Sequence, residues 1–229
     1  MLREAGRDDV AEVLGDVAAL GPYFEIITGP AEVAGVAWRR FPDAERLFAA
    51  TMDCGERLGT EERRVAASIL LQGLASRLWS PVVAAAARGI VPDLAGLHWR
   101  WAPGESVALG LADPRGWRVA EVGQAADLIH PMVVDGHLRP LREMMLRFVS
   151  LADGLVWGNA ASALAGSLNV GPPGGFRAEL VRELLGRAPL ADAGHFGAEG
   201  FVRRNCCLYY RAPGGGMCGD CGLLSRNLR

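Results

Sequence analysis

Four of the five cysteines lie close together near the end of the chain, in the sequence CCLYYRAPGGGMCGDC of residues 206–221. They are Cys206, Cys207, Cys218 and Cys221, with the spacing C-C-x10-C-x2-C. A C-x2-C pair can place two thiolates on one metal, an arrangement that zinc and iron–sulfur sites share. Pro213 and the three glycines that follow it would let the backbone close tightly around such a centre.

The adjacent cysteines favour an iron–sulfur cluster. Neighbouring side chains of a strand point to opposite faces, so Cys206 and Cys207 can both bind one centre only where the backbone bends. Structural zinc sites mostly use two separated C-x2–4-C hooks. A 2Fe–2S cluster is larger and takes two ligands on each iron, but the spacing does not show how four thiolates divide between the irons. Zinc binding and a thiol–disulfide or free-thiol role stay open alternatives. Cys54 stands apart on the apolar side of an expected helix, and we interpret it as a core residue.

Composition excludes several other chemistries. The chain has 229 residues, half of them apolar, and a formal charge of −2, so it lacks the basic excess of a nucleic-acid-binding protein. Every basic residue is arginine, which excludes a P-loop, a pyridoxal Schiff base and an SxxK hydrolase, since each needs a lysine. We find neither a signal peptide nor a convincing membrane span, and therefore expect a cytoplasmic protein. In that compartment clustered cysteines are more often metal-binding or catalytic than disulfide-bonded.

Motifs for other enzyme classes are missing from the sequence. There is no GxSxG, and no GxGxxG follows an expected strand, so we predict no hydrolase site and no nucleotide or flavin site. The four histidines are scattered without metal-binding spacing, and we interpret each as a structural or surface residue. A redox centre in this chain would therefore take its electrons from an external donor.

Hydrophobic periodicity predicts a helix-dominated α+β fold with a small antiparallel sheet. Expected helices are 8–20, 42–58, 61–88, 140–151, 155–168 and 176–186, with Pro81 kinking or interrupting the third. Expected strands are 23–27, 33–38, 98–101, 106–111 and 117–121, and 188–200 reads as loop. We divide the chain into a body, 1–193, and a C-terminal cluster-binding segment, 194–229. Because that segment has little apolar content, a metal centre is its expected source of order.

The ending RRNCCLYYRAPGGGMCGDC resembles the C-terminal segment of the FhuF family of ferric-siderophore (ferric hydroxamate) reductases, whose signature is the same C-C-x10-C-x2-C pattern. The stretches ASRLWSPVVAAA and VWGNAASALAG are similar to stretches found in such reductases. The resemblance implies that Cys206, Cys207, Cys218 and Cys221 hold a 2Fe–2S cluster. It also implies one-electron reduction of Fe(III) in a hydroxamate siderophore, which releases Fe(II), since the softer ion is held more weakly by hard oxygen ligands.

The flanking charges have two interpretations. Arg203, Arg204 and Arg211 could favour the reduced cluster and raise its potential, or they could be solvated or paired with Glu199 and Asp220. Backbone amides of 214–219 could act on the potential in the same direction. Candidate substrate contacts are Arg77, Trp79, Trp157, Asn159, Arg204, Tyr209 and Tyr210.

The implied partners are a ferric siderophore and an external donor such as a ferredoxin or a flavin reductase. Peripheral attachment at the inner face of the membrane is compatible with the resemblance, although no basic amphipathic helix requires it. Two alternative functions use the same cysteines: an iron–sulfur redox or iron sensor, and a zinc-stabilised binding module. A siderophore-synthesis domain is a third, but the chain is too short for the nucleotide machinery of those enzymes.

Overall fold

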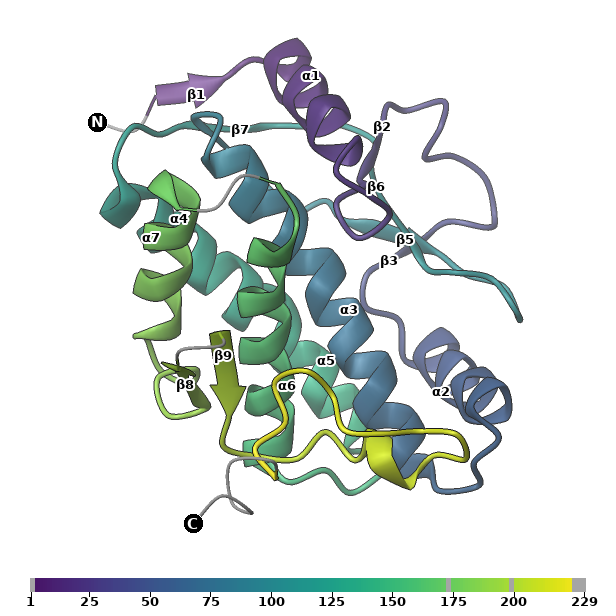
Figure 1. Ribbon diagram of the computed structural model, residues 1–229. Helices are drawn as coiled ribbons and strands as arrows, with labels where there is room; N and C mark the ends of the chain where they lie inside the picture. The colour runs from purple at the N-terminus through teal and green to yellow at the C-terminus, as the bar shows by residue number, and fades with distance from the viewer. Residues whose placement is uncertain (1–2, 172–173, 198–199, 224–229) are drawn as a thin grey trace.

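Helix α3 (Arg63–Ala86) runs through the middle of the molecule and is buried along most of its length (Figure 1). The computed structural model describes residues 3–171, 174–197 and 200–223. A helix that is apolar on nearly all sides belongs in a core, and α3 packs against α1, α2, α4, α6 and α7. By length and composition α3 could also cross a membrane, but 67% of its most apolar window is buried inside the protein.

Helices make up about half of the described chain. They are α1 (Arg7–Ala18), α2 (Ala44–Leu58), α3, α4 (Val122–Val133), the π-helical η1 (Val134–Leu138), α5 (Arg139–Met145), α6 (Asp153–Gly166), the 3-10 turn η2 (Ser167–Asn169), α7 (Gly175–Leu185) and the 3-10 turn η3 (Tyr209–Arg211). Helix α6 is the principal partner of α3. Two glycines of α6, Gly154 and Gly158, pack against Asn205, so that the C-terminal segment lies close to this helix.

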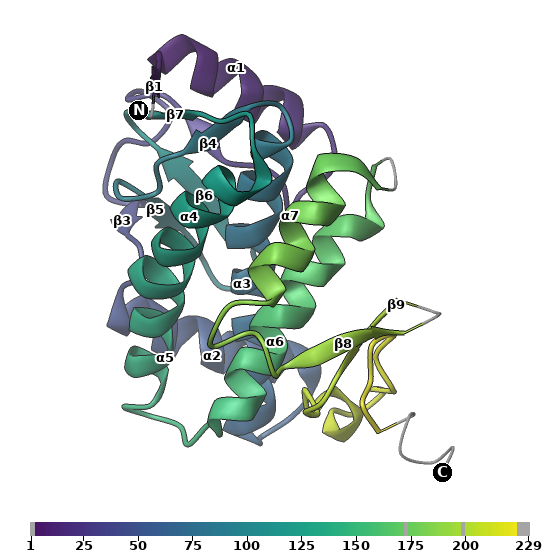
Figure 2. The same ribbon diagram turned by 90° about the vertical axis from the view of Figure 1, so that its left-hand side faces the viewer.

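The strands are short and form three small sheets. They are β1 (Arg3–Ala5), β2 (Ile27–Thr28), β3 (Arg39–Arg40), β4 (Ile90–Pro92), β5 (His98–Arg100), β6 (Ala108–Leu111), β7 (Gly116–Arg118), β8 (Gly194–Gly197) and β9 (Gly200–Arg203). The orders are β1-β7-β4, β2-β6-β5-β3 and β8-β9, and every pairing is antiparallel except β2 with β6. The first two sheets lie near α1, whereas the β8–β9 hairpin stands beside α6 (Figure 2).

The predicted α+β class is confirmed, and several predicted elements need correction. Helix α4 lies in a stretch for which the sequence predicted no element, because Gly123 and Pro131 weaken its pattern. The stretch 33–38 contains no strand, and 23–27 contributes only its last residue to β2. The hairpin strand β8 falls in a stretch predicted as loop. Helix α3 is continuous from Arg63 to Ala86, so Pro81 does not interrupt it.

His137 in η1 is a buried titratable group. It is 5% exposed, and its ring lies 5.8 Å from that of Phe41. Burial lowers the pKa of His137 to about 4. A hydrogen bond to the Leu94 backbone carbonyl and the charge of Asp93 oppose this shift, and Arg40 lowers the pKa further. The folded protein therefore holds this imidazole neutral at pH values where the unfolded chain already protonates it.

We predict that His137 makes the free energy of unfolding fall as pH drops from 6.5 to 4. Between these pH values the unfolded state binds the extra proton, so the loss reaches about 3 kcal/mol for this shift. Denaturant titration of the wild type and of His137→Gln gives the free energy of unfolding of each protein across this pH range. The contribution of His137 is the difference between the slopes of the two free energies against pH. Parallel curves for the two proteins would contradict the prediction.

Candidate metal centre

The cysteine segment, residues 203–222, crosses the ends of α3 and α6 (Figure 1). Strand β9 packs on α6 and η3 packs on α3, so the two central helices position the segment from both sides. All five cysteines of the chain are free thiols. Cys207 and Cys221 are buried, whereas Cys206 and Cys218 are half-buried.

The backbone bends at the adjacent cysteines, as a shared centre requires. Leu208, the next residue, has φ +69°, a left-handed conformation that is rare for a side chain of its size. The bend turns successive amides toward sulfur: Leu208 N–H donates to Cys206 Sγ at 3.3 Å, and Tyr209 N–H donates to the Cys207 sulfur. Such donors stabilise negative charge on a thiolate or a cluster sulfur.

The Sγ atoms of Cys207 and Cys218 lie 3.5 Å apart. Two thiolates on one tetrahedral metal with bonds of about 2.3 Å would lie about 3.8 Å apart. The hydrogen bond from the Cys218 thiol lowers the pKa of Cys207 to about 6 and, conversely, raises the pKa of Cys218. Burial raises the pKa of Cys206, to which the Cys207 and Cys221 thiolates add repulsion.

Within the residues that the structure describes, no three His, Cys, Asp or Glu side chains converge as they would around a single metal ion. The sulfurs are instead spread over the segment, with Cys207 and Cys218 as one close pair. Cys221 contacts the Met217 sulfur at 3.6 Å. Four thiols with no competing disulfide, one pair already at the spacing of a shared metal, are a donor set that fits a two-iron cluster.

Two glycines close the segment by allowing backbone contacts that a Cβ would block. Gly215 packs on the carbonyls of Tyr209 and Ala212, and a Cβ there would lie 2.8 Å from the latter. Gly222 packs on the Arg203 carbonyl. Gly214 adopts φ +70°. The predicted need for glycine in this loop is therefore confirmed at Gly214 by conformation and at Gly215 by space.

A buried guanidinium anchors the segment to the helices. Arg203 is 1% exposed and forms a two-point ion pair with Asp220, with N–O distances of 2.9 and 2.7 Å. Its other donors reach α6, at Asn159 Oδ1 (2.7 Å) and Ser162 Oγ (2.6 Å). Burial works to lower the pKa of Arg203, but Asp220 more than offsets it and raises the pKa. The pKa of Asp220 is depressed, since Arg203 and Ser162 outweigh its burial.

The network continues from α6 to α3 and back to the cysteines. Asn159 Nδ2 donates to the Ser68 carbonyl and hydroxyl oxygens at 2.9 and 2.8 Å. Ser68 Oγ in turn donates to the Cys207 carbonyl at 2.6 Å. The segment thus has an order of its own, from buried polar contacts, in addition to any order that a metal centre would supply.

Sequence reasoning missed Ser68, Ser162 and the role of Asp220 in this network. The available signal was a polar stripe along the otherwise apolar α3, with a polar residue at every fourth position. The stripe consists of Ser68, Gln72, Ser76 and Ser80. It faces α6 and the cysteine segment, and Gln72 Nε2 donates to Ser162 Oγ at 3.2 Å.

Each of the three flanking arginines has an acidic partner. Arg203 pairs with Asp220, Arg204 with Asp192 at 3.1 Å and Arg211 with Glu62 at 2.9 Å. The paired interpretation of these charges therefore holds in the structure, with Asp220 as one of its predicted partners. Glu199, the other predicted partner, lies outside the described residues.

The proposed substrate contacts occupy different environments. Trp79 is fully buried in the core, and Asn159 belongs to the network beneath the cysteines. Arg77 bonds the Pro22 carbonyl at 2.6 Å and stacks on Tyr23. Trp157 is 9% exposed and lies under the Arg139 guanidinium. Near the cysteines, Arg204 and Tyr210 are exposed and Tyr209 is half-buried. A role of these residues in substrate binding stays a prediction.

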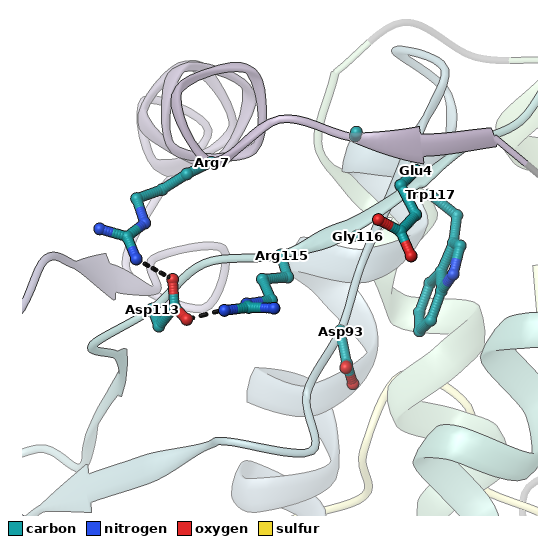
Figure 3. Close-up of a pocket in the computed structure, with 8 residues that line it drawn as sticks. Glu4, Arg7, Asp93, Asp113, Arg115, Gly116 and Trp117 are labelled. Carbon is teal, nitrogen blue, oxygen red and sulfur yellow. Dashed lines mark hydrogen bonds and ion pairs between the residues drawn. The ribbon is translucent and has the colours of Figure 1, made fainter.

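Strands β1 and β7 lie at the opposite end of the molecule from the cysteine segment (Figure 1), and a different cavity lies beside them. It has a volume of about 400 Å³ and is formed around β1 and β7. Arg7 and Arg115 both point to Asp113, at 2.6 and 2.8 Å (Figure 3). These charges satisfy one another, and the cavity contains none of the cysteines.

Comparison with known protein families agrees with the geometry. Residues 203–222 match the family model described as the FhuF 2Fe-2S C-terminal domain. The match spans 20 of the 229 residues and agrees, over this short segment, with the resemblance to the FhuF family inferred from the cysteine spacing. The match covers the docked segment from the anchor Arg203 to Gly222. No curated protein sequence matches the chain significantly.

We predict that Arg203→Met releases the cysteine segment. The substitution leaves the half-buried Asp220 carboxylate without its partner, and breaking a pair of this kind costs up to about 3–5 kcal/mol. The buried Cys207 thiol of the reduced, metal-free protein should then react with a disulfide reagent at least about a hundredfold faster.

Arg204→Met is the matched control for this experiment. It also removes an arginine from an ion pair beside the cysteines, but that pair is exposed on both sides and contributes little. Thiol reactivity in Arg204→Met should equal that of the wild type. Equal reactivity in the two variants would show that the buried pair does not hold the segment.

Proposed function

We propose that this protein is a ferric-siderophore reductase whose Cys206, Cys207, Cys218 and Cys221 hold a 2Fe–2S cluster. The carrying observation is the match of residues 203–222 to the FhuF 2Fe-2S domain, on a segment that carries four free thiols and that a buried polar network anchors to α3 and α6. When bound, the cluster supplies one-electron chemistry, which matches the single electron that converts Fe(III) to Fe(II). The substrate is Fe(III) in a hydroxamate chelate, and the product is Fe(II), which the chelate holds weakly.

The protein's own groups prepare the site for this chemistry. The amides of Leu208 and Tyr209 donate to the cysteine sulfurs and favour added negative charge there. Arg203 places a buried positive charge near Cys207 and Cys218, partly compensated by Asp220. Cys206 and Cys218 are half-buried, so both an electron donor and a bulky chelate can approach the site.

The electron is supplied by an external donor of the ferredoxin or flavin-reductase class. We place the reaction in the cytoplasm, where iron enters as intact chelate in this scheme and leaves as Fe(II). No side chain needs to bind the substrate iron, because electron transfer can proceed through the ligand shell. The sensor and zinc-module alternatives share the cysteines and are separated from this proposal by the outcomes below.

We predict that anaerobically reconstituted protein binds two irons and two acid-labile sulfides per chain. Its visible absorbance should bleach with dithionite and return when ferrioxamine B is added, with a ferrous chelator trapping one Fe(II) per cluster oxidised. Cys207→Ala should abolish the colour and the trapped Fe(II), whereas Cys54→Ser, a change at the one cysteine outside the segment, should retain both.

Three results would contradict the proposal in distinguishable ways. A colourless protein with one zinc would favour the binding module. A bleachable cluster that ferrioxamine B cannot reoxidise would favour the sensor. A coloured, active Cys207→Ala protein would remove Cys207 from the ligand set.

The sulfur geometry also predicts how the ligands divide. Cys207 and Cys218 lie 3.5 Å apart, which favours a shared iron and leaves Cys206 and Cys221 for the other. Serine can replace a cysteine ligand with a harder oxygen and perturb mainly the iron to which it is bound. In Mössbauer spectra, Cys207→Ser and Cys218→Ser should therefore shift the same iron, and Cys206→Ser and Cys221→Ser the other. Perturbation of one iron by both Cys206→Ser and Cys207→Ser would contradict this division.

A further inference from the structure

A cleft of about 590 Å³ opens directly beside the cysteine segment. Its floor is made by α3 and by the second half of α6, which continues into η2. The β8–β9 hairpin and residues 218–220 form one wall, and the loop after α1 closes the opposite side. Figure 2 shows the hairpin and the cysteine segment to one side of α6.

The position of the cleft connects it to the redox centre. Cys218 and Gly219 are part of its wall, so a molecule in the cleft touches the loop that carries a proposed iron ligand. The other cavities described in the structure contain none of Cys206, Cys207, Cys218 and Cys221. Its volume lies within the range of about 300–1,000 Å³ that small-molecule sites occupy.

The floor of the cleft is polar but uncharged. Gln72, Ser76 and Ser80 from the α3 stripe line it, together with Ser162 of α6. Amide and hydroxyl groups both donate and accept hydrogen bonds, which suits a ligand that displays carbonyl and amide groups. Among the described lining residues, Asp220 is the only charged one, and its carboxylate is already paired with Arg203.

Aromatic side chains form the rim. Phe196 and Phe201 pack edge to face with ring centroids 5.6 Å apart, and Tyr23 lies across from them. Phe196 and Tyr23 are 42% and 48% exposed, although each is a large apolar side chain that would gain from cover. Apolar rims of this kind bind the hydrocarbon linkers of a ligand whose polar head faces the floor.

We propose that this cleft is the docking site of the ferric chelate and that it selects chelates of low charge. The inference rests on the proposed function and adds a place and a selection rule to it. Fe(III) bound by three hydroxamates forms a neutral core, because each hydroxamate carries one negative charge. A tris-catecholate complex carries three negative charges, for which the described lining offers no unpaired cation.

Binding is tested with gallium(III) desferrioxamine B, a redox-inert copy of the ferric chelate, by calorimetry on cluster-loaded protein. Ser76→Leu should weaken binding at least about tenfold, because the larger side chain fills the floor. Phe196→Ala should weaken it about fivefold or more through loss of the rim. A gallium(III) tris-catecholate should bind the wild type at least about tenfold more weakly.

Phe48→Ala is the matched control. Phe48 is 40% exposed and pairs edge to face with Phe148 at 5.2 Å, much as Phe196 pairs with Phe201, but it lies on α2 and does not line the cleft. Its affinity for the gallium chelate should equal that of the wild type. In all variants the cluster absorbance and its reoxidation by ferricyanide should be unchanged, which shows that the redox centre is intact.

The outcomes separate the cleft from the reductase function. Wild-type binding with unchanged affinity in both cleft variants would overturn the cleft, even if ferrioxamine B is reduced. Absence of gallium-chelate binding to the wild type would overturn it as well. Binding that Ser76→Leu and Phe196→Ala both weaken would support the cleft, even if no Fe(II) is trapped, and only the reductase proposal would then fail.

Discussion

The buried ion pair between Arg203 and Asp220 is the interaction on which the cysteine segment depends. It joins the start of the segment to its end, and the backbone N–H of Arg203 adds a bond to the Asp220 carbonyl at 3.0 Å. The remaining donors of the guanidinium are used by α6. Desolvation makes such a pair a weak source of net stability, but breaking it is costly, so its main effect is to specify one arrangement of the loop.

Ion pairs also reduce the net positive charge that the flanking arginines bring to the candidate redox site. Three arginines near Cys206 and Cys207 suggest a positive environment, yet each of them faces a carboxylate. Net charge around the sulfurs is therefore small, and directed amides become the more specific influence. The bend at Leu208 supplies them, because it turns two successive N–H groups toward two successive cysteines. A strained φ at a non-glycine residue is thus connected to a function that the geometry supports.

One stripe of residues on α3 serves both the segment and the neighbouring cleft. Ser68 bonds the Cys207 carbonyl, and Gln72 reaches Ser162 next to the anchor arginine. One turn further along, Ser76 and Ser80 line the cleft. A rigid helix therefore fixes the position of the cleft relative to the cysteines, and no flexible linker separates the two. This continuity is the physical basis for treating them as parts of one site.

The sequence alone predicted the fold class and indicated the kind of metal centre that the C-terminal cysteines could form. The spacing C-C-x10-C-x2-C pointed to a FhuF-type iron–sulfur segment, and periodic apolar residues predicted the main helices. These signals are local, since ligand spacing and helical period are properties of short stretches. Gly123 and Pro131 obscured α4, for which tertiary packing outweighs propensity.

Only the tertiary structure decided what holds the cysteines and what lies beside them. Arg203 is 44 residues from Asn159, and Asn159 is 91 from Ser68, so no local pattern could pair them. The partners of Arg204 and Arg211, and the closeness of Cys207 to Cys218, likewise depend on how the chain returns to α3 and α6. Arg203, Asn159 and Ser68 hold the cysteine segment in place because they are buried, and a polar group removed from water must find its hydrogen-bond partners inside the fold.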